Sequence, residues 1–235
     1  MISVCIATYN GEKYIEEQIS SILHQLSPTD EIIISDDNSS DRTAQIIQEM
    51  QDNRIKFITN KKQQVRNNFY AVSLNFENAI KHSKGEFIFL ADQDDLWSDN
   101  KISVCLEYLK KFDLLLHDCQ IIDRENNIMV DSYFKLNKSR PGIISNLLKN
   151  SYLGCCMAFN RKILLDAMPI PCEIPHDIWF GLVAEKKHTV FFIKKALVKY
   201  RRHGSNLSPS GEKSSNPFIF KIMYRWKILT KLLKV

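Results

Sequence analysis

Apolar runs alternate with amphipathic patterns along the N-terminal part of the chain. Short and almost continuous apolar runs predict four strands, at residues 2–7, 31–35, 55–59 and 86–91. Apolar residues spaced three to four positions apart predict the helices between them, at residues 12–25, 41–50 and 69–82. Strands joined through helices run parallel, and runs without polar alternation indicate that both sheet faces are covered. The pattern therefore predicts an α/β fold with a mostly parallel central sheet flanked by helices.

The second half of the chain is less regular. Its patterns predict a strand at 114–121, a polar link at 126–140, and helices at 99–111, 143–149, 161–168 and 178–187. Pro169, Pro171 and Pro175 interrupt any regular element between the last two helices. No interdomain linker is visible, so we expect one domain over residues 1–210 and a tail over residues 211–235.

Composition adds limits on the class of protein. The chain has 235 residues, of which 44% are hydrophobic and 25% are charged, as is usual for a folded domain. No basic n-region precedes the first apolar run, and no run approaches the ~20 apolar residues of a membrane span. The six cysteines form no CxxC pair, so we expect buried thiols rather than a zinc site. These features predict a cytoplasmic protein.

The net charge of +5 is concentrated in the tail. Residues 213–235 carry six Lys or Arg and no acidic residue, so the rest of the chain sums to about −1. Nucleic-acid binding, which favours a basic surface spread over the domain, is therefore not expected. A predicted tail helix gathers its apolar residues on one face: Phe218, Ile219, Ile222, Met223, Trp226, Leu229 and Leu233. Such a helix either packs on the protein's own sheet or lies at a membrane surface, and its cations favour anionic lipid at the inner face of the cytoplasmic membrane.

Polar residues directly follow three of the predicted strands. They are Thr8, Tyr9 and Asn10 after the first strand, Asp36 and Asp37 after the second, and the run 92–95 after the most apolar strand. In an open parallel sheet, ligands bind beyond the carboxyl ends of the strands. The three polar segments are therefore expected to lie around one ligand.

The run 92–95 has the sequence Asp-Gln-Asp-Asp. Asp92 and Asp94 can both reach one hard cation such as Mg²⁺ or Mn²⁺, with phosphate oxygens completing the shell. The alternative is a solvated acidic turn that caps the following helix, with Asp95 bonding to the helix start. The position after a buried strand favours a site, because carboxylates crowded there repel one another unless a cation compensates.

Three segments resemble the family 2 glycosyltransferases, which have the GT-A fold for nucleotide-diphospho-sugar transferases. They are VCIATYN at 4–10, SDDNSSD at 35–41 and GEFIFLADQDDLW at 85–97. The resemblance implies a nucleotide-binding half over 1–100 and an acceptor-binding half over 101–210. It implies nucleotide contacts from Ala7, Thr8, Tyr9, Asn10, Glu12, Asp37, Asp92 and Gln93. It also implies that Asp92 and Asp94 hold Mn²⁺ or Mg²⁺, with His203 as a third contact.

The same resemblance extends more loosely into the second half. It implies that Asp177 is the general base, although this residue is also a candidate cap of the 178–187 helix. Small residues at Gly154 and Cys155 would leave room for the acceptor sugar, although ordinary core packing explains them equally. The segment 200–208 would close over the donor. The remaining implied donor or acceptor contacts are Asp95, Trp97, His176, Arg201 and Arg202, with the arginines neutralising phosphate.

The implied reaction is an inverting transfer with a single displacement. The donor would be a nucleotide-sugar, dTDP-rhamnose or a UDP-sugar, and the acceptor a glycan or a polyprenyl-diphosphate-linked glycan. The detailed motifs resemble bacterial enzymes of surface polysaccharide and O-antigen synthesis, including rhamnosyltransferases. A sugar nucleotidyltransferase is one alternative, but its first loop would be rich in glycine and basic residues that bind the triphosphate, and this sequence has no such loop. A non-enzymatic, membrane-associated sugar-binding module is another, and it requires Asp94 and Asp177 to be purely structural.

Overall fold

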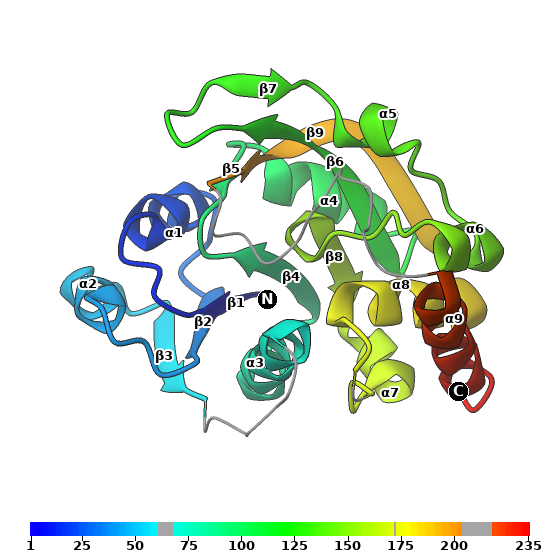
Figure 1. Cartoon of the computed structure of the whole chain (residues 1–235). Helices are drawn as coiled ribbons and strands as arrows, with labels where there is room; N and C mark the ends of the chain where they lie inside the picture. The colour runs from blue at the N-terminus through cyan, green and yellow to red at the C-terminus, as the bar shows by residue number, and fades with distance from the viewer. Residues whose placement is uncertain (61–67, 172, 204–217) are drawn as a thin grey trace.

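The protein is described here by a computed structural model, which covers residues 1–60, 68–171, 173–203 and 218–235 (Figure 1). Within these residues lies a nine-stranded sheet with the strand order β3-β2-β1-β4-β8-β6-β9-β5, and β7 pairs with β6 outside this path. Figure 1 shows the sheet curling from β3 to the long strand β9, with helices around it. The predicted fold class is confirmed.

The first half of the sheet is parallel, as expected. Its strands are β1 (Ile2–Thr8), β2 (Glu31–Asp36), β3 (Ile55–Thr59) and β4 (Phe87–Asp92). They are connected through the helices α1 (Ile15–Leu23), α2 (Thr43–Glu49) and α3 (Asn68–His82). Ile32, Ile33 and Ile34 are consecutive in β2 and all 0% exposed, because both faces of the sheet are covered.

The second half of the sheet mixes directions. Strand β8 (Met157–Asn160) runs antiparallel to β4 and to β6 (Leu114–Ile122), so it joins the two halves. The predicted helices appear as α4 (Lys101–Leu109), α6 (Ile143–Leu148), η2 (Arg161–Ile163) with α7 (Leu164–Ala167), and α8 (His176–Lys187). The first three are shorter than expected, and α8 begins two residues earlier. A short turn of 3-10 helix, η1 (Gly154–Cys156), precedes β8.

Several elements were not predicted. The expected polar link contains β7 (Ile128–Val130) and α5 (Tyr133–Asn137), and β5 (Leu96–Trp97) follows the acidic run. The largest omission is β9 (Val190–Arg201), whose apolar run is interrupted by the exposed Lys194 and Lys195. Pairing with β6 on one side and β5 on the other stabilises β9, and the local sequence contains no sign of these distant partners.

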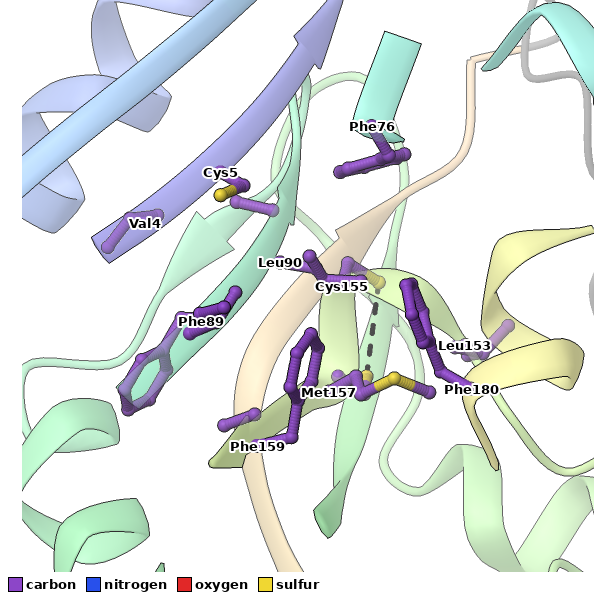
Figure 2. Packing of buried hydrophobic residues seen from close by; sticks show 14 of the residues in the cluster. Val4, Cys5, Phe76, Phe89, Leu90, Leu153, Cys155, Met157, Phe159 and Phe180 are labelled. Carbon is purple, nitrogen blue, oxygen red and sulfur yellow. Dashed lines mark hydrogen bonds between the residues drawn. The ribbon is translucent and has the colours of Figure 1, made fainter. Parts of the chain in front are cut away.

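The main core lies between β1, β4, β8 and α8 (Figure 2). Leu90 of β4 points into it beside Cys5 of β1, whereas Phe89 points to the opposite face of the sheet, where its ring lies 5.9 Å from that of Trp97. The rings of Phe159 and Phe180 lie 5.2 Å apart and connect β8 to α8. The five described cysteines are free and buried, in agreement with thiols that pack as small apolar side chains.

The tail helix α9 (Phe218–Leu232) packs on α6 and α8. Ile228 and Leu232 are buried in this contact, and the Lys186 ammonium donates to the Leu232 carbonyl at 2.9 Å. One side of the tail is therefore docked on the domain. Among the described residues, no helix is long and apolar enough to cross a membrane.

Strand register brings the predicted site segments to one edge. Thr8 of β1 is paired with Asp36 of β2, and Ala7 of β1 is paired with Asp92 of β4. The chain leaves all three strands at the same level. The loops that follow them are therefore neighbours.

Gly181 of α8 gives a test of the packing. A Cβ at this position would lie 2.4 Å from the ring of Tyr152, which is 0% exposed and donates its hydroxyl to Glu185 at 2.6 Å. Alanine normally stabilises a helix relative to glycine, but here we expect Gly181→Ala to lower the free energy of unfolding by about 2 kcal/mol, because the ring is held in place. Urea denaturation measures this change. Glu107→Ala, at an exposed helical position, should stay within about 0.5 kcal/mol, and a Gly181→Ala protein as stable as wild type would contradict the packing.

Candidate active site

Gln93 fastens the acidic run to the loop after β1. Its side-chain oxygen accepts hydrogen bonds from the Thr8 hydroxyl at 2.6 Å and the Tyr9 amide at 2.9 Å, and its NH₂ group donates to the Tyr9 carbonyl at 3.1 Å. Gly11 leaves room for this arrangement, since a Cβ there would lie 2.6 Å from the Gln93 oxygen. Gln93 was expected to touch the nucleotide, and the structure shows it as a brace between two loops.

Asn10 and Glu12 fasten the same loop to the segment after β2. The Asn10 amide donates to the Ser39 hydroxyl at 2.8 Å, and the Asn10 side chain accepts from the Ser40 amide at 2.9 Å. Asn10 has a φ of 50°, in the left-handed region that asparagine tolerates better than most residues. The Glu12 carboxylate accepts from the Arg42 amide at 3.0 Å. Both residues therefore shape the rim of the site.

Three other expected nucleotide contacts lie at the ends of β1 and β2. Ala7 and Thr8 are the last two residues of β1, and the Asp37 amide donates to the Thr8 carbonyl at 2.9 Å. Asn60 approaches the Asp37 carboxylate at 3.5 Å. The Tyr9 side chain is 49% exposed, so an aromatic face borders solvent at this edge of the sheet.

The carboxylates of the acidic run are crowded and poorly solvated. Burial, with the neighbouring charges of Asp94 and Asp177, raises the pKa of Asp92 to about 7. Burial also raises the pKa of Asp95 well above its usual value, and the charge of Asp94 adds to the shift. One Asp95 oxygen accepts from the Arg201 amide at 2.9 Å, while the other is buried with no hydrogen-bond partner among the described residues. Ionised carboxylates in this acidic run are stable only if a cation compensates their charge or if one of them binds a proton.

The residues present fit a divalent ion. One ligand atom each from Asp92, Asp95 and Cys155 lies within 4.8 Å of the others, and Asp94 accepts from or donates to His203 at 2.6 Å, depending on the protonation of the pair. Carboxylate oxygens suit Mg²⁺ and Mn²⁺, and imidazole nitrogen suits Mn²⁺. The structure thus pairs Asp94 with His203, and it groups Asp92 with Asp95 and Cys155.

Arg201 requires a correction. The resemblance implied a phosphate contact, but this side chain is 1% exposed and bonds within the protein. Its guanidinium donates to the carbonyl of Asp94 at 2.8 Å, to Asn126 at 2.5 Å and to Glu17 at 2.8 Å. Arg201 therefore supports the acidic run from behind, as a buried cation next to buried carboxylates.

His203 and Tyr14 complete this support. The imidazole of His203 stacks on Tyr14, with ring centroids 5.2 Å apart, and the Arg201 guanidinium lies 4.7 Å above the same tyrosine ring. Arg124 donates to the His203 carbonyl at 2.5 Å. Arg202 is half-buried, and its amide donates to Ile122 at 2.9 Å. The rest of the expected closing segment, 204–208, lies outside the described residues.

The candidate base lies at the start of α8. Asp177 accepts a hydrogen bond from the Ile178 amide at 2.7 Å, so it also satisfies a helix N-terminus. Burial raises its pKa to about 6, although the Ile178 hydrogen bond opposes this shift. The start of α8 lies beside the acidic run, since Gly154 faces the ring of His176 and the next residue, Cys155, has its thiol within 4.8 Å of the Asp92 and Asp95 carboxylates. A carboxylate with a pKa near 6 suits proton transfer at neutral pH.

His176 is buried rather than open to a ligand, and Gly154 takes the second of its two expected roles, core packing. His176 is 8% exposed, and its amide donates to the Ser73 hydroxyl at 3.0 Å. Burial lowers the pKa of His176 to about 3, so the ring is neutral. A Cβ on Gly154 would lie 2.6 Å from the His176 ring nitrogen. The small residue at 154 therefore makes room for this histidine rather than for a sugar, and His176 fixes the start of α8 on α3.

Trp97 lies beneath the site. Its side chain is 4% exposed, and the Lys101 ammonium lies 3.7 Å from the ring centroid. Lys101 is itself 0% exposed and donates to the Cys155 carbonyl at 2.8 Å. Trp97 and Asp95 were expected to touch donor or acceptor, and both are instead buried behind the surface of the site. Cys155, at 1% exposure, contacts the carboxylates rather than open space.

Several supporting residues were missed by the sequence reasoning. Gln18 donates to the Asp92 carbonyl at 2.9 Å, and Asn75 donates to the Thr8 carbonyl at 3.1 Å. Lys101 and Tyr14 are the other two. All four lie in or beside helices, where a polar residue is usually expected to face solvent. Only the unusual burial of a lysine in the three-dimensional structure distinguishes Lys101.

The arrangement matches a known family. The family model described as glycosyl transferase family 2 matches residues 3–166, which is more than half of the chain. This chain belongs to glycosyltransferase family 2. The resemblance seen in the three sequence motifs is thereby confirmed.

Two relatives of this family 2 member act, by their names, in bacterial glycan assembly. The UDP-Glc:alpha-D-GlcNAc-diphosphoundecaprenol beta-1,3-glucosyltransferase WfgD of Escherichia coli is 28% identical over 234 residues, covering 97% of this chain and 85% of the relative. The GalNAc(5)-diNAcBac-PP-undecaprenol beta-1,3-glucosyltransferase of Campylobacter jejuni is 30% identical over 207 residues, covering 85% of this chain. The present chain spans 64% of that second relative.

Solved structures support the fold. Residues 1–349 of S. aureus TarS, in complex with UDP-GlcNAc, superimpose with a TM-score of 0.72 and 18% sequence identity. The match covers 99% of this chain and 66% of the TarS chain. At this identity the likeness concerns the fold, which is the GT-A arrangement expected from the motifs.

Arg201 provides the test of the support around the acidic run. We expect Arg201→Met to lower the free energy of unfolding by about 3 kcal/mol, because it removes the guanidinium bonds to the Asp94 carbonyl, Asn126 and Glu17. Arg202→Met is the matched control and should change stability by less than about 1 kcal/mol. Thermal or urea denaturation of both proteins measures the difference. An Arg201→Met protein with unchanged stability but weaker nucleotide binding would instead identify Arg201 as a phosphate ligand.

Proposed function

We propose that this family 2 member is a metal-dependent, inverting glycosyltransferase that elongates a lipid-linked glycan. The observation that carries the proposal is the contact of the start of α8 with η1: Gly154 faces the His176 ring, and the Cys155 thiol lies within 4.8 Å of the Asp92 carboxylate. It supports a site shared by a base candidate, Asp177, and a metal-ligand candidate, Asp92, from opposite halves of the chain. The E. coli and C. jejuni relatives, named for undecaprenol-diphosphate-linked acceptors, support a polyprenyl-diphosphate-linked acceptor. The E. coli name also favours a UDP-sugar over dTDP-rhamnose as donor.

The donor would bind at the carboxyl ends of β1, β2 and β4. The exposed ring of Tyr9 would stack on the base, and the carboxylate of Asp37 would accept a hydrogen bond from the nucleoside. Asp92, Asp94 and His203 would hold Mn²⁺ or Mg²⁺. When bound, the ion would neutralise the diphosphate and so stabilise it as a leaving group.

Asp177 would act on the acceptor. Its carboxylate takes the proton of the acceptor hydroxyl while that oxygen forms a bond to the anomeric carbon of the donor. The bond between the anomeric carbon and the diphosphate oxygen breaks in the same displacement, and its electron pair stays with the diphosphate. Attack on the face opposite the leaving group inverts the configuration. Arg201 and Lys101 stay behind the site and keep the acidic run in position.

Asp94→Asn tests the metal half of the proposal. We expect this variant to lose at least about 100-fold in Mn²⁺-dependent release of nucleoside diphosphate, because one oxygen ligand becomes an amide. Release is measured with a panel of UDP-, dTDP- and GDP-sugars, with and without Mn²⁺. Asp99→Asn, at an exposed carboxylate five residues further on, is the control and should keep full activity. Full metal-dependent activity of Asp94→Asn would disprove this half of the proposal.

Asp177→Asn tests the base. We expect transfer to fall by about 100- to 10,000-fold, because the amide cannot take the proton, while donor binding persists. In the wild-type protein, transfer should fall as the pH drops through about 6, where Asp177 becomes protonated. Asp131→Asn, at an exposed position, should keep the wild-type rate and pH profile. Transfer by Asp177→Asn at the wild-type rate would remove the residue from the mechanism.

The same substitution should stabilise the fold at neutral pH. Because the folded-state pKa of Asp177 lies above its value of 3.8 in an unfolded chain, the folded protein loses stability as the pH rises from about 4 to about 6. Asparagine carries no such penalty and can still accept from the Ile178 amide. We therefore expect Asp177→Asn to gain about 2 kcal/mol at pH 7.5 and close to nothing near pH 4. Urea denaturation at the two pH values checks the sign.

A further inference from the structure

The tail helix presents an exposed apolar face. Ile219, Ile222, Met223 and Trp226 are 70%, 48%, 66% and 66% exposed, and their spacing places them on one side of α9. The opposite side, with Ile228 and Leu232, is buried against the domain. One side of the tail helix therefore fits the expectation of a helix docked on the domain, and the other side fits the expectation of a helix at a membrane surface. Docking on the domain leaves the exposed side uncovered by any described residue.

The neighbouring helix α6 enlarges this surface. Ile144 and Leu148, one helical turn apart, are 76% and 62% exposed. Arg225 of α9 donates to the carbonyls of Leu147 and Leu148 at 2.8 Å each, so the two helices are fixed together. Figure 1 shows α6 and α9 adjacent at one end of the molecule. We define the α6–α9 face by Ile144, Leu148, Ile219, Ile222, Met223 and Trp226.

The charges that α6 and α9 themselves carry have one sign. Neither α6 nor α9 contains an acidic residue, while α9 and the residues after it carry Lys221, Arg225, Lys227, Lys231 and Lys234. Lys227 forms an ion pair with Glu173, and Lys231 and Lys234 are exposed. At 100° per residue, Lys227, Lys231 and Lys234 flank the apolar stripe on one side and Arg225 flanks it on the other. Apolar residues flanked by cations are complementary to an anionic lipid surface.

The face also lies near the candidate base. Helix α9 packs on α8, whose second residue is Asp177, and the Asp177 charge contributes to the raised pKa of Tyr224 in α9. Burial is the main cause of that shift, so Tyr224 lies on the docked side of the helix. One helix thus separates the α6–α9 face from the residue proposed to act on the acceptor.

We propose that the α6–α9 face docks on an anionic membrane surface and thereby holds the acceptor side of the site at the bilayer. The docking follows from the apolar and charged residues alone. Its use, the presentation of a lipid-linked acceptor to Asp177, rests on the proposed function. The helix lies along the surface, with Trp226 and the aliphatic side chains inserted between headgroups and the lysines next to anionic headgroups.

Vesicle binding by the full chain tests the proposal. We expect binding to phosphatidylcholine vesicles that contain phosphatidylglycerol, weaker binding to phosphatidylcholine alone, and a decrease with added salt. Brominated lipids should quench the fluorescence of Trp226, because the other tryptophans, Trp97 and Trp179, are 4% and 2% exposed. The double variant Ile222→Ser, Trp226→Ser should bind at least about 10-fold more weakly.

Matched variants control for general surface effects. Leu165→Ser removes an 86% exposed leucine on α7 and should bind vesicles as wild type does. Lys231→Glu with Lys234→Glu should weaken binding by about 10-fold or more, whereas Lys194→Glu with Lys195→Glu on β9 should weaken it less. All substituted side chains are exposed, so thermal unfolding should change little.

Two results would overturn the docking proposal. One is vesicle binding by the Ile222→Ser, Trp226→Ser protein that equals wild type. The other is a dimer in analytical ultracentrifugation that this double variant breaks, together with no vesicle binding, since the face would then join two copies of the chain. Release of nucleoside diphosphate in solution reports on the transferase separately. Vesicle binding without any such release would leave the docking standing and remove the proposed function.

Discussion

Asp92 and Asp95 stand at the end of a buried strand, where little water reaches two adjacent carboxylates. Leaving such charges uncompensated is costly, and elements from the second half of the chain surround them with polar groups. Strand β9 brings the amide and guanidinium of Arg201, α4 brings Lys101, and η1 brings the Cys155 thiol. The mixed second half of the sheet can be understood as the scaffold that delivers these groups. The first half alone would present the carboxylates without their support.

The two candidate chemical groups differ in how their charge is controlled. At Asp177, the helix N-terminus and the Ile178 amide both favour the charged form, yet burial outweighs them and raises the pKa. At the acidic run, mutual repulsion adds to burial, and the positive charge that opposes the shift comes from the buried Lys101. The face of the acidic run toward the donor is thereby left for other partners. An arrangement of this kind sacrifices stability of the folded chain for a site in which charge is poorly solvated.

Periodicity predicted the parallel half of the fold because its strands and helices carry their signals locally. Strand β9 escaped because Lys194 and Lys195 interrupt its apolar run, and its partners β5 and β6 are distant in sequence. The acidic run was found because three motifs mark the ends of adjacent strands. The motifs did not distinguish the residues of this site that face a ligand from the residues that support them.

Arg201, Trp97 and His176 carry side chains that suit ligand binding, and the structure buries all three. Burial of a polar side chain depends on partners that the local sequence does not contain. Arg201 bonds to Glu17, 184 positions away, and His176 bonds to Ser73, 103 positions away. At Gly154, space for a sugar and ordinary core packing stayed equally open, because the sequence cannot show that His176 fills that space. Function was therefore easier to predict than the assignment of individual residues.

The path of β9 limits which segments can be exchanged between two relatives to make a chimaeric protein. Only His188 and Thr189 separate α8 from β9, and β9 then runs to the acidic run, where Arg201 binds Asp94 and Glu17. An exchange of everything after residue 100 between two relatives would replace this arginine together with the half of the chain proposed to bind the acceptor. The retained carboxylates would face a foreign partner. Chimaeras that keep residues 198–203 from the same parent as residues 1–97 preserve the contact, so acceptor specificity is best transplanted as an internal segment.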